Sequence, residues 1–136
     1  MLYLDDYRQP QDSYKYTGRE IYLNPNWKVV KNYDEFVDHI LTYGLPSIIS
    51  FDHDLAEIHY NNNVVIDYSS YEEKTGYDCA KWLVDYCLDN DCYPPKTMYC
   101  HSMNPVGAKN INELLNNFLY SIVRKHEEEF KKNKNG

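Results

Sequence analysis

Residues 48–55 read Ile-Ile-Ser-Phe-Asp-His-Asp-Leu, so a short apolar run stops abruptly at two acids that flank a histidine. A run of this length and composition, preceded by Pro46, predicts a buried β-strand. Burying two carboxylates at the end of a strand is costly unless a cation or hydrogen-bond donors compensate their charge. The end of this strand is therefore the first place to look for a metal site or a proton relay.

The composition is that of one globular domain. The chain has 136 residues, of which 43% are hydrophobic and 26% are charged, and this length is sufficient to bury a real core. We expect residues 1–125 to form a single α/β domain and residues 126–136 to form a charged tail that frays. The net charge of −7 argues against long duplex nucleic acid as a partner. A small nucleotide held through a metal ion is compatible with that charge.

The cysteines and the N-terminus indicate the compartment. The four cysteines form no Cys-x-x-Cys motif, and Cys79 and Cys87, two helical turns apart, predict small buried thiols in a reducing environment. The first residues lack the basic segment of a signal peptide, and no apolar run approaches membrane-spanning length. We therefore expect a cytoplasmic protein without a membrane partner. The sequence does not indicate the oligomeric state.

Predicted strands and helices alternate along the chain. Residues 11–19 are interpreted as a polar turn, and residues 56–74 as a hairpin or a mobile flap over the strand end. Helices are expected after Asn32, Thr75 and Asn104, because each of these capping residues precedes apolar residues at helical spacing. This order predicts a small three-layer α/β domain with a mainly parallel central sheet and helices on both faces. Strands are expected at residues 2–4, 20–23, 27–31, 48–51 and 97–100.

Three of these strands end in residues that can do chemistry: Asp5-Asp6, Asp52-His53-Asp54 and His101-Ser102. Ligands of such sheets bind outside the carboxyl ends of the strands, so these ends should meet at one edge. Carboxylate oxygens are the ligands that Mg²⁺ and Mn²⁺ prefer, which makes Asp5, Asp6 and Asp52 the candidate metal ligands. The alternative is that each aspartate only caps a turn or pairs with Arg8.

The histidines at these strand ends are candidates for proton transfer. Side chains alternate along a strand, so Asp52 and Asp54 should share one side while His53 faces away. His101 is therefore the preferred proton carrier. Asp52, Asp54 and His53 remain further catalytic candidates.

The segment after His101 predicts an anion site. Asn104 followed by Pro105 predicts a helix start, where free N–H groups and a partial positive charge attract phosphate. Ser102, Asn104 and Gly107 are accordingly candidate substrate-binding residues, and Arg8 could clamp a phosphate through two hydrogen bonds. The alternatives are that Asn104 is only a cap and that Arg8 only pairs with Asp6.

Four blocks of the sequence resemble the cyclic-phosphate processing receiver family: residues 4–10, 50–55, 75–78 and 101–107. The resemblance implies a receiver- or flavodoxin-like sheet with an acidic, metal-binding edge. It also implies activity on cyclic phosphate groups in nucleotides or at RNA ends.

By analogy with receiver domains, the resemblance implies that Asp5 and Asp6 hold the metal and that Asp52 occupies the phosphoacceptor position. It also places Ser102 where receivers carry a hydroxyl group. One departure is that no fifth strand ends in the lysine that ordinary receivers use to recognise a phosphoryl group. This departure favours acid–base chemistry over aspartyl-phosphate signalling.

The sequence thus favours a metal-dependent phosphoesterase that acts on a cyclic nucleotide or on a 2′,3′-cyclic phosphate end of RNA. One alternative is a module that binds a nucleotide without hydrolysing it. The other is a degenerate receiver that serves in signalling or protein interaction.

Overall fold

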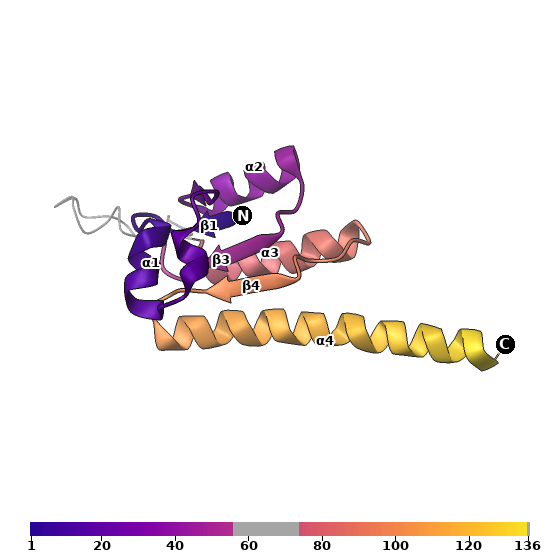
Figure 1. The fold of residues 1–136 in the computed structure, drawn as a ribbon. Coiled ribbons are helices and arrows are strands. Elements are labelled where there is room, and N and C mark those ends of the chain that lie inside the picture. The colour runs from indigo at the N-terminus through magenta and orange to yellow at the C-terminus, as the bar shows by residue number, and fades with distance from the viewer. Residues whose placement is uncertain (56–73, 136) are drawn as a thin grey trace.

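A computed structural model describes residues 1–55 and 74–135. Within these residues, a four-stranded parallel sheet has the strand order β2-β1-β3-β4, with helices packed on both faces (Figure 1). The expected receiver-like α/β fold is confirmed. The strands are β1 (Leu2–Leu4), β2 (Lys28–Val30), β3 (Ile48–Phe51) and β4 (Thr97–Cys100), and the helices are α1 (Pro10–Thr17), η1 (Glu20–Leu23), α2 (Tyr33–Tyr43), α3 (Gly76–Asp89) and α4 (Pro105–Asn135).

The helix starts that the sequence predicts are confirmed by their caps. The Asn32 side chain accepts a hydrogen bond from the N–H of Glu35, and the Thr75 side chain accepts one from Asp78 within a capping box. Asn104 Oδ1 accepts the N–H of Gly107 at 3.0 Å, at the first turn of α4. Each cap satisfies N–H groups that have no partner inside the helix.

Two predictions in the N-terminal quarter are wrong. Residues 11–19 are not a turn, because Pro10–Thr17 forms α1, and residues 20–23 form the 3₁₀-helix η1 instead of an edge strand. Helix α1 begins with a proline and ends at Gly18, which has φ +69, an arrangement that favours a short helix. Its apolar side chains are too few to produce a helical pattern in the sequence.

The main core lies on the face of the sheet that α2, α3 and α4 cover. Leu2 and Leu4 of β1 and Ile49 and Phe51 of β3 all point to this face and are fully buried. Their positions alternate along each strand, as a strand with two different faces requires. They pack against Phe36 and Ile40 of α2, Cys79, Ala80, Leu83 and Cys87 of α3, and Ile111, Leu115 and Phe118 of α4. The prediction that Cys79 and Cys87 are buried free thiols is confirmed.

The opposite face of the sheet carries a layer of tyrosines. Tyr3 of β1 is fully buried, and its ring lies edge-on to Tyr22 of η1 and to Trp27. The Tyr3 hydroxyl contacts Ser13 of α1 at 2.6 Å. Helices α1 and η1 therefore cover this face with aromatic rings whose hydroxyl groups are hydrogen-bonded.

The connectivity brings the carboxyl ends of all four strands to one edge, beside the starts of α3 and α4 (Figure 1). The far half of α4 extends past the other elements to the C-terminus. The helix therefore continues through residues 126–135, while the predicted domain boundary at residue 125 stays a prediction. The hairpin or flap predicted for residues 56–74 lies, apart from Lys74, outside the described residues. No described helix combines the length and the apolar character needed to span a membrane.

Candidate functional site

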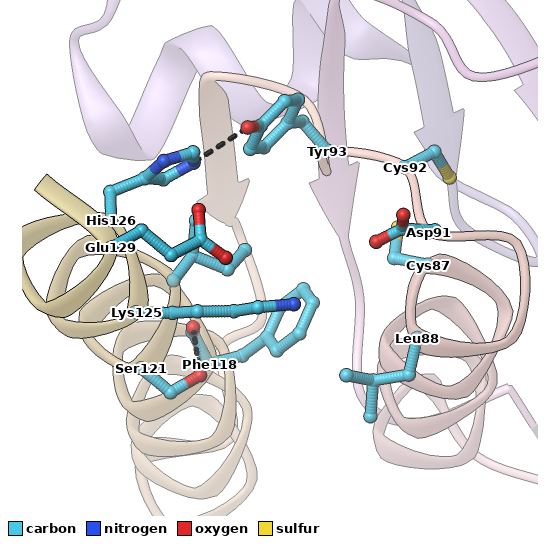
Figure 2. A pocket seen from close by; sticks show the side chains of 11 residues that line it. Cys87, Leu88, Asp91, Cys92, Tyr93, Phe118, Ser121, Lys125, His126 and Glu129 are labelled. Atoms are coloured by element: carbon cyan, nitrogen blue, oxygen red, sulfur yellow. Dashed lines mark hydrogen bonds between the residues drawn. The ribbon is translucent and has the colours of Figure 1, made fainter. Parts of the chain in front are cut away.

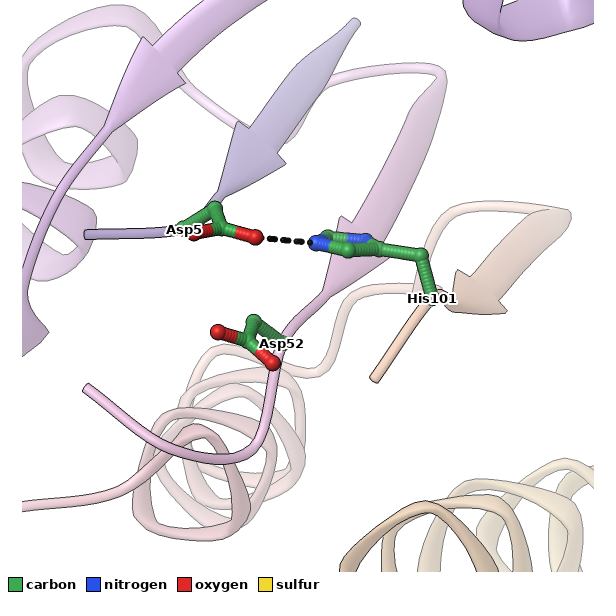
Figure 3. Close-up of side chains that lie close together, drawn as sticks. All are labelled: Asp5, Asp52 and His101. Atoms are coloured by element: carbon green, nitrogen blue, oxygen red, sulfur yellow. Dashed lines mark hydrogen bonds and ion pairs between the residues drawn. The ribbon is translucent and has the colours of Figure 1, made fainter. Parts of the chain in front are cut away.

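The backbone ladder brings three chemically capable residues together at the carboxyl edge. Asp5 follows β1, Asp52 follows β3 and His101 follows β4. Each of them donates its N–H to the last residue of a neighbouring strand, at 3.0, 3.0 and 2.9 Å respectively. The three side chains consequently face one another (Figure 3).

Asp5 is fully buried and accepts several hydrogen bonds. Its Oδ1 accepts the N–H groups of Tyr7 at 3.1 Å and Arg8 at 2.9 Å, and its Oδ2 lies 3.0 Å from His101 Nε2. Burial alone would raise the pKa of Asp5. The hydrogen bonds from His101, Arg8 and Tyr7 outweigh that effect and hold the pKa of Asp5 below its ordinary value. Asp5 is therefore ionised at neutral pH.

Asp52 is 3% exposed and is less well compensated than Asp5. Its Oδ1 accepts the N–H of His53 at 2.9 Å. Burial, followed by the negative charge of Asp5, raises the pKa of Asp52 to about 7. Two carboxylates that share a site rarely both ionise freely, because their negative charges repel. A bound cation would offset this repulsion.

His101 is 1% exposed, and both of its ring nitrogens have partners. Nε2 lies 3.0 Å from Asp5 Oδ2, and Nδ1 lies 2.7 Å from Ser50 Oγ. The ring also stacks on Tyr3, with 4.3 Å between the ring centroids. Burial lowers the pKa of His101 below its ordinary value, although Asp5 opposes the shift. His101 is therefore a neutral imidazole at neutral pH.

These protonation states give the hydrogen bonds a direction. Ionised Asp5 can only accept, so the proton of neutral His101 is on Nε2 and its Nδ1 accepts from Ser50. Ser50 Oγ in turn lies 2.7 Å from the hydroxyl of Tyr22, whose pKa burial raises to about 12. The chain of donors therefore runs from Tyr22 through Ser50 and His101 to Asp5.

Arg8 places a cation beside both acids. Its Nη1 lies 3.7 Å from Asp5 Oδ2 and 4.0 Å from Asp52 Oδ1. The guanidinium also lies over the rings of Tyr7 and Tyr16, with its Cζ 5.0 and 5.7 Å from their centroids. Arg8 can therefore neutralise the acid pair or turn toward a bound phosphate.

His53 and Asp54 contact each other instead of facing opposite ways. His53 Nδ1 lies 2.8 Å from Asp54 Oδ1, and the Asp54 side chain is 66% exposed. The expectation that Asp52 and Asp54 share one side fails because β3 ends at Phe51, so strand alternation does not continue through residues 52–54. Residues 52–54 therefore consist of a buried Asp52 and a more exposed His53–Asp54 pair.

Two glycines allow this turn to lie close to the helix starts. A Cβ at Gly76 would be 1.6 Å from the carbonyl oxygen of Asp52, and a Cβ at Gly107 would be 2.3 Å from Cγ of the His53 ring. Both distances are far below any real contact, so α3 and α4 can approach the turn only through glycine. The position of His53 thus depends on Gly107.

The start of α4 offers fewer anion-binding groups than the sequence suggested. Pro105 has no N–H, the N–H of Gly107 is bound by the Asn104 side chain, and the N–H of Ala108 donates to the Asn104 carbonyl. Ser102 Oγ accepts the N–H of Asn104 at 3.1 Å. The Ser102 hydroxyl can still donate its own proton. The substrate-binding roles of Arg8, Ser102, Asn104 and Gly107 stay predictions.

Among the described residues, one group of His, Cys, Asp or Glu could hold a metal ion: Asp5, Asp52 and His101, whose ligand atoms all lie within 4.8 Å of one another. Two carboxylates and one imidazole suit a divalent ion such as Mn²⁺, and two carboxylates alone suit Mg²⁺. Asp6 is not in this group, although its charge contributes to the raised pKa of Asp52. Its role as a ligand stays a prediction.

Sequence reasoning missed Ser50 and Tyr22, which hold His101 in place. Ser50 interrupts the apolar run of β3, between Ile49 and Phe51. A polar residue inside an apolar strand indicated that Ser50 makes a polar contact on the face of the sheet opposite to Ile49 and Phe51. The partner Tyr22 belongs to a segment that the sequence assigned to the wrong element, so the contact could not be foreseen.

A separate hollow lies at the other end of α3 and is lined in part by the C-terminal half of α4 (Figure 2). Its volume is about 310 Å³, and at its rim the Tyr93 hydroxyl lies 2.6 Å from His126 Nε2. Helix α3 begins at the carboxyl edge of the sheet and ends at the opposite edge. This hollow is therefore not part of the Asp5–Asp52–His101 site.

Comparison with known proteins agrees with this geometry. The family model described as cyclic-phosphate processing receiver domain matches residues 1–117. No curated protein and no solved structure gives a significant match. The family match covers the four strands, the three acidic or histidine-bearing strand ends and the first turns of α4. The chain therefore belongs to the cyclic-phosphate processing receiver domain family.

Proposed function

We propose that this protein is a metal-dependent phosphoesterase that opens a cyclic phosphate, in a cyclic nucleotide or at a 2′,3′-cyclic end of RNA. The observation that carries the proposal is the buried Asp5–Asp52–His101 group at the carboxyl edge of a chain of this family. Buried titratable groups whose pKa values are shifted by burial and by a nearby charge tend to mark functional sites. The reaction adds water to phosphorus and breaks one ester bond of the ring.

The residues present fit a divalent cation. Burial, followed by the negative charge of Asp5, raises the pKa of Asp52, and a dication held by the two carboxylates would offset both causes by stabilising the ionised form. When bound, Mg²⁺ or Mn²⁺ would stabilise charge on the phosphate oxygens and acidify an attacking water. Asp6 remains a proposed additional ligand.

In this proposal His101 orients Asp5. Its Nε2–H donates to Asp5 Oδ2 while Ser50 donates to Nδ1, so rotation of either ring or carboxylate would break a buried hydrogen bond. Were His101 also to hold the metal ion through Nε2, its ring proton would be on Nδ1 and Ser50 would accept it. A serine hydroxyl can take either part.

Proton transfer is assigned to His53 in place of His101. Both nitrogens of His101 are occupied and its ring is buried, whereas His53 uses Nδ1 for Asp54 and is partly exposed. The contact with Asp54 orients the His53 ring, and Gly107 allows the ring to lie against α4. His53 would accept a proton from the attacking water and return one to the leaving oxygen.

Arg8 and Ser102 would bind the phosphate oxygens. The guanidinium is within 4.0 Å of both carboxylates, and an incoming dication would repel it toward the anion. Ser102 can donate its hydroxyl proton from the start of α4.

Ring opening can be measured directly. A panel of 2′,3′- and 3′,5′-cyclic nucleotides and a cyclic-ended RNA oligonucleotide is incubated with Mg²⁺ or Mn²⁺ and followed by ³¹P NMR. We expect loss of the cyclic phosphate signal, abolished in Asp52→Asn and unchanged in Asp38→Asn, which alters an exposed aspartate on α2. Absence of ring opening with every substrate and metal would refute the proposal.

Capture of a nucleotide without hydrolysis is the second candidate. It is favoured by the occupancy of both His101 nitrogens and by the closeness of Arg8 to Asp5, which together give His101 and Asp5 their partners without a bound substrate. Denaturing the complex and analysing the ligand by mass spectrometry separates the two functions. Intact cyclic ligand supports capture, and opened product excludes it.

A further inference from the structure

A polar groove lies between the first turns of α3 and the first half of α4. Its volume is about 570 Å³, and its lining includes Tyr77 of α3 and Asn110, Glu113 and Asn117 of α4. The three α4 residues follow i, i+3, i+7 spacing, which puts them on one face of the helix. Leu114 adds an apolar surface beside them.

The groove begins at the turn formed by residues 52–54, which carries the proposed catalytic residues. His53 lines one end of it, and His53 directly follows Asp52, so the two Cα atoms are about 3.8 Å apart. The His53 ring is held against α4 at Gly107, one turn before Asn110. A nucleotide whose phosphate is bound at Asp52 would therefore have to pass His53 to place its base in the groove.

The chemistry of the lining differs from that of a phosphate site. None of the described residues that line the groove is a lysine or an arginine. Asn110 and Asn117 each present an amide that both donates and accepts, Glu113 accepts only, and Tyr77 supplies an aromatic ring. This set complements a flat, uncharged ring with donors and acceptors along its edge.

We propose that this groove binds the nucleobase of the cyclic nucleotide whose phosphate lies at Asp5 and Asp52, an inference that rests on the proposed function. The base stacks against Tyr77, and its edge bonds to the two asparagines and to Glu113. Guanine is the preferred base, because it alone presents a ring N–H and an amino group side by side to a carboxylate acceptor. The site thereby selects cyclic nucleotides over cyclic phosphates that carry no base.

The activity test compares 2′,3′-cyclic nucleotides of the four bases with glycerol 1,2-cyclic phosphate, which has no base. We expect kcat/KM to be highest for the guanine nucleotide. In Asn110→Ala and Asn117→Ala, the ratio of kcat/KM for this nucleotide to that for glycerol cyclic phosphate should fall about tenfold, the effect of one lost hydrogen bond. Asn116→Ala, an exposed asparagine outside the groove, should leave the ratio unchanged. Glu113→Gln should remove the preference for guanine.

A binding test without phosphate separates this inference from the proposed function. Guanosine, adenosine, cytidine and uridine are titrated into ¹⁵N-labelled protein, and the side-chain amide signals of Asn110 and Asn117 are followed. Shifts that are strongest with guanosine support the groove even if no substrate is hydrolysed. Equal turnover of glycerol cyclic phosphate and the nucleotides, or no shift with any nucleoside, overturns the inference while leaving the phosphoesterase proposal to its own assay.

Discussion

Replacing Asp52 with asparagine should stabilise the metal-free protein at alkaline pH. The pKa of Asp52 is about 7 in the folded protein, against 3.8 as its ordinary value. The difference of about three pH units corresponds to about 4 kcal/mol, at about 1.4 kcal/mol for each unit. The asparagine side chain has a similar shape without the charge, so most of this cost should disappear in Asp52→Asn.

The sign of the pH dependence follows from proton linkage. Because the folded pKa of Asp52 is raised, the folded state holds its proton longer than the unfolded state between about pH 4 and pH 7. Asp52 therefore lowers the free energy of unfolding progressively across this window, and the loss is complete above pH 7. His101, with its lowered pKa, acts in the opposite direction below its ordinary value of 6.5, but it is present in both proteins.

The assay is urea unfolding followed by circular dichroism at pH 4.5 and pH 8 in EDTA. Asp52→Asn should exceed the wild type by about 2–4 kcal/mol at pH 8 and by much less at pH 4.5. Asp38→Asn, an exposed control, should change stability by about 0.5 kcal/mol or less at either pH. Adding Mn²⁺ at pH 8 should stabilise the wild type but not Asp52→Asn. A gain of equal size at both pH values would refute the reasoning.

Three further changes test the neighbouring residues. Gly107→Ala would place its Cβ 2.3 Å from the His53 ring, so we expect turnover to fall at least tenfold while circular dichroism stays native; unchanged turnover would contradict the role of His53. Ser50→Ala removes the donor to His101 Nδ1 and should cost about 1–3 kcal/mol in urea unfolding. It should also change the ¹⁵N shifts of the His101 ring. Identical shifts would exclude the chain of hydrogen bonds from Tyr22 through Ser50 and His101 to Asp5. Arg8→Gln removes the cation within 4.0 Å of both acids, so calorimetry should detect tighter Mn²⁺ binding, and KM for the substrate should rise. Weaker Mn²⁺ binding would show that Arg8 does not compete with the metal ion for the two acids.

The N-terminal quarter illustrates why part of the fold could not be predicted. Helix α1 and the 3₁₀-helix η1 are short and mostly polar, so their stability comes from capping, from the turn at Gly18 and from packing of Tyr22 and Ser13 against the sheet. None of these causes produces a periodic apolar pattern. The strands and the other three helices were predictable because their buried residues recur at the period of the element.

For the site, the amino-acid sequence was enough to show that acids and a histidine end three parallel strands, because strand order and the right-handed crossover bring those ends to one edge. Which of these groups are buried together and which are exposed is determined only by the tertiary structure. Strand β3 stops at Phe51, which separates Asp52 from the His53–Asp54 pair. The opposite face of the sheet supplies Ser50 and Tyr22 to His101. Side-chain contacts of this kind depend on where each strand ends and on what covers the far face, and packing between distant segments decides both.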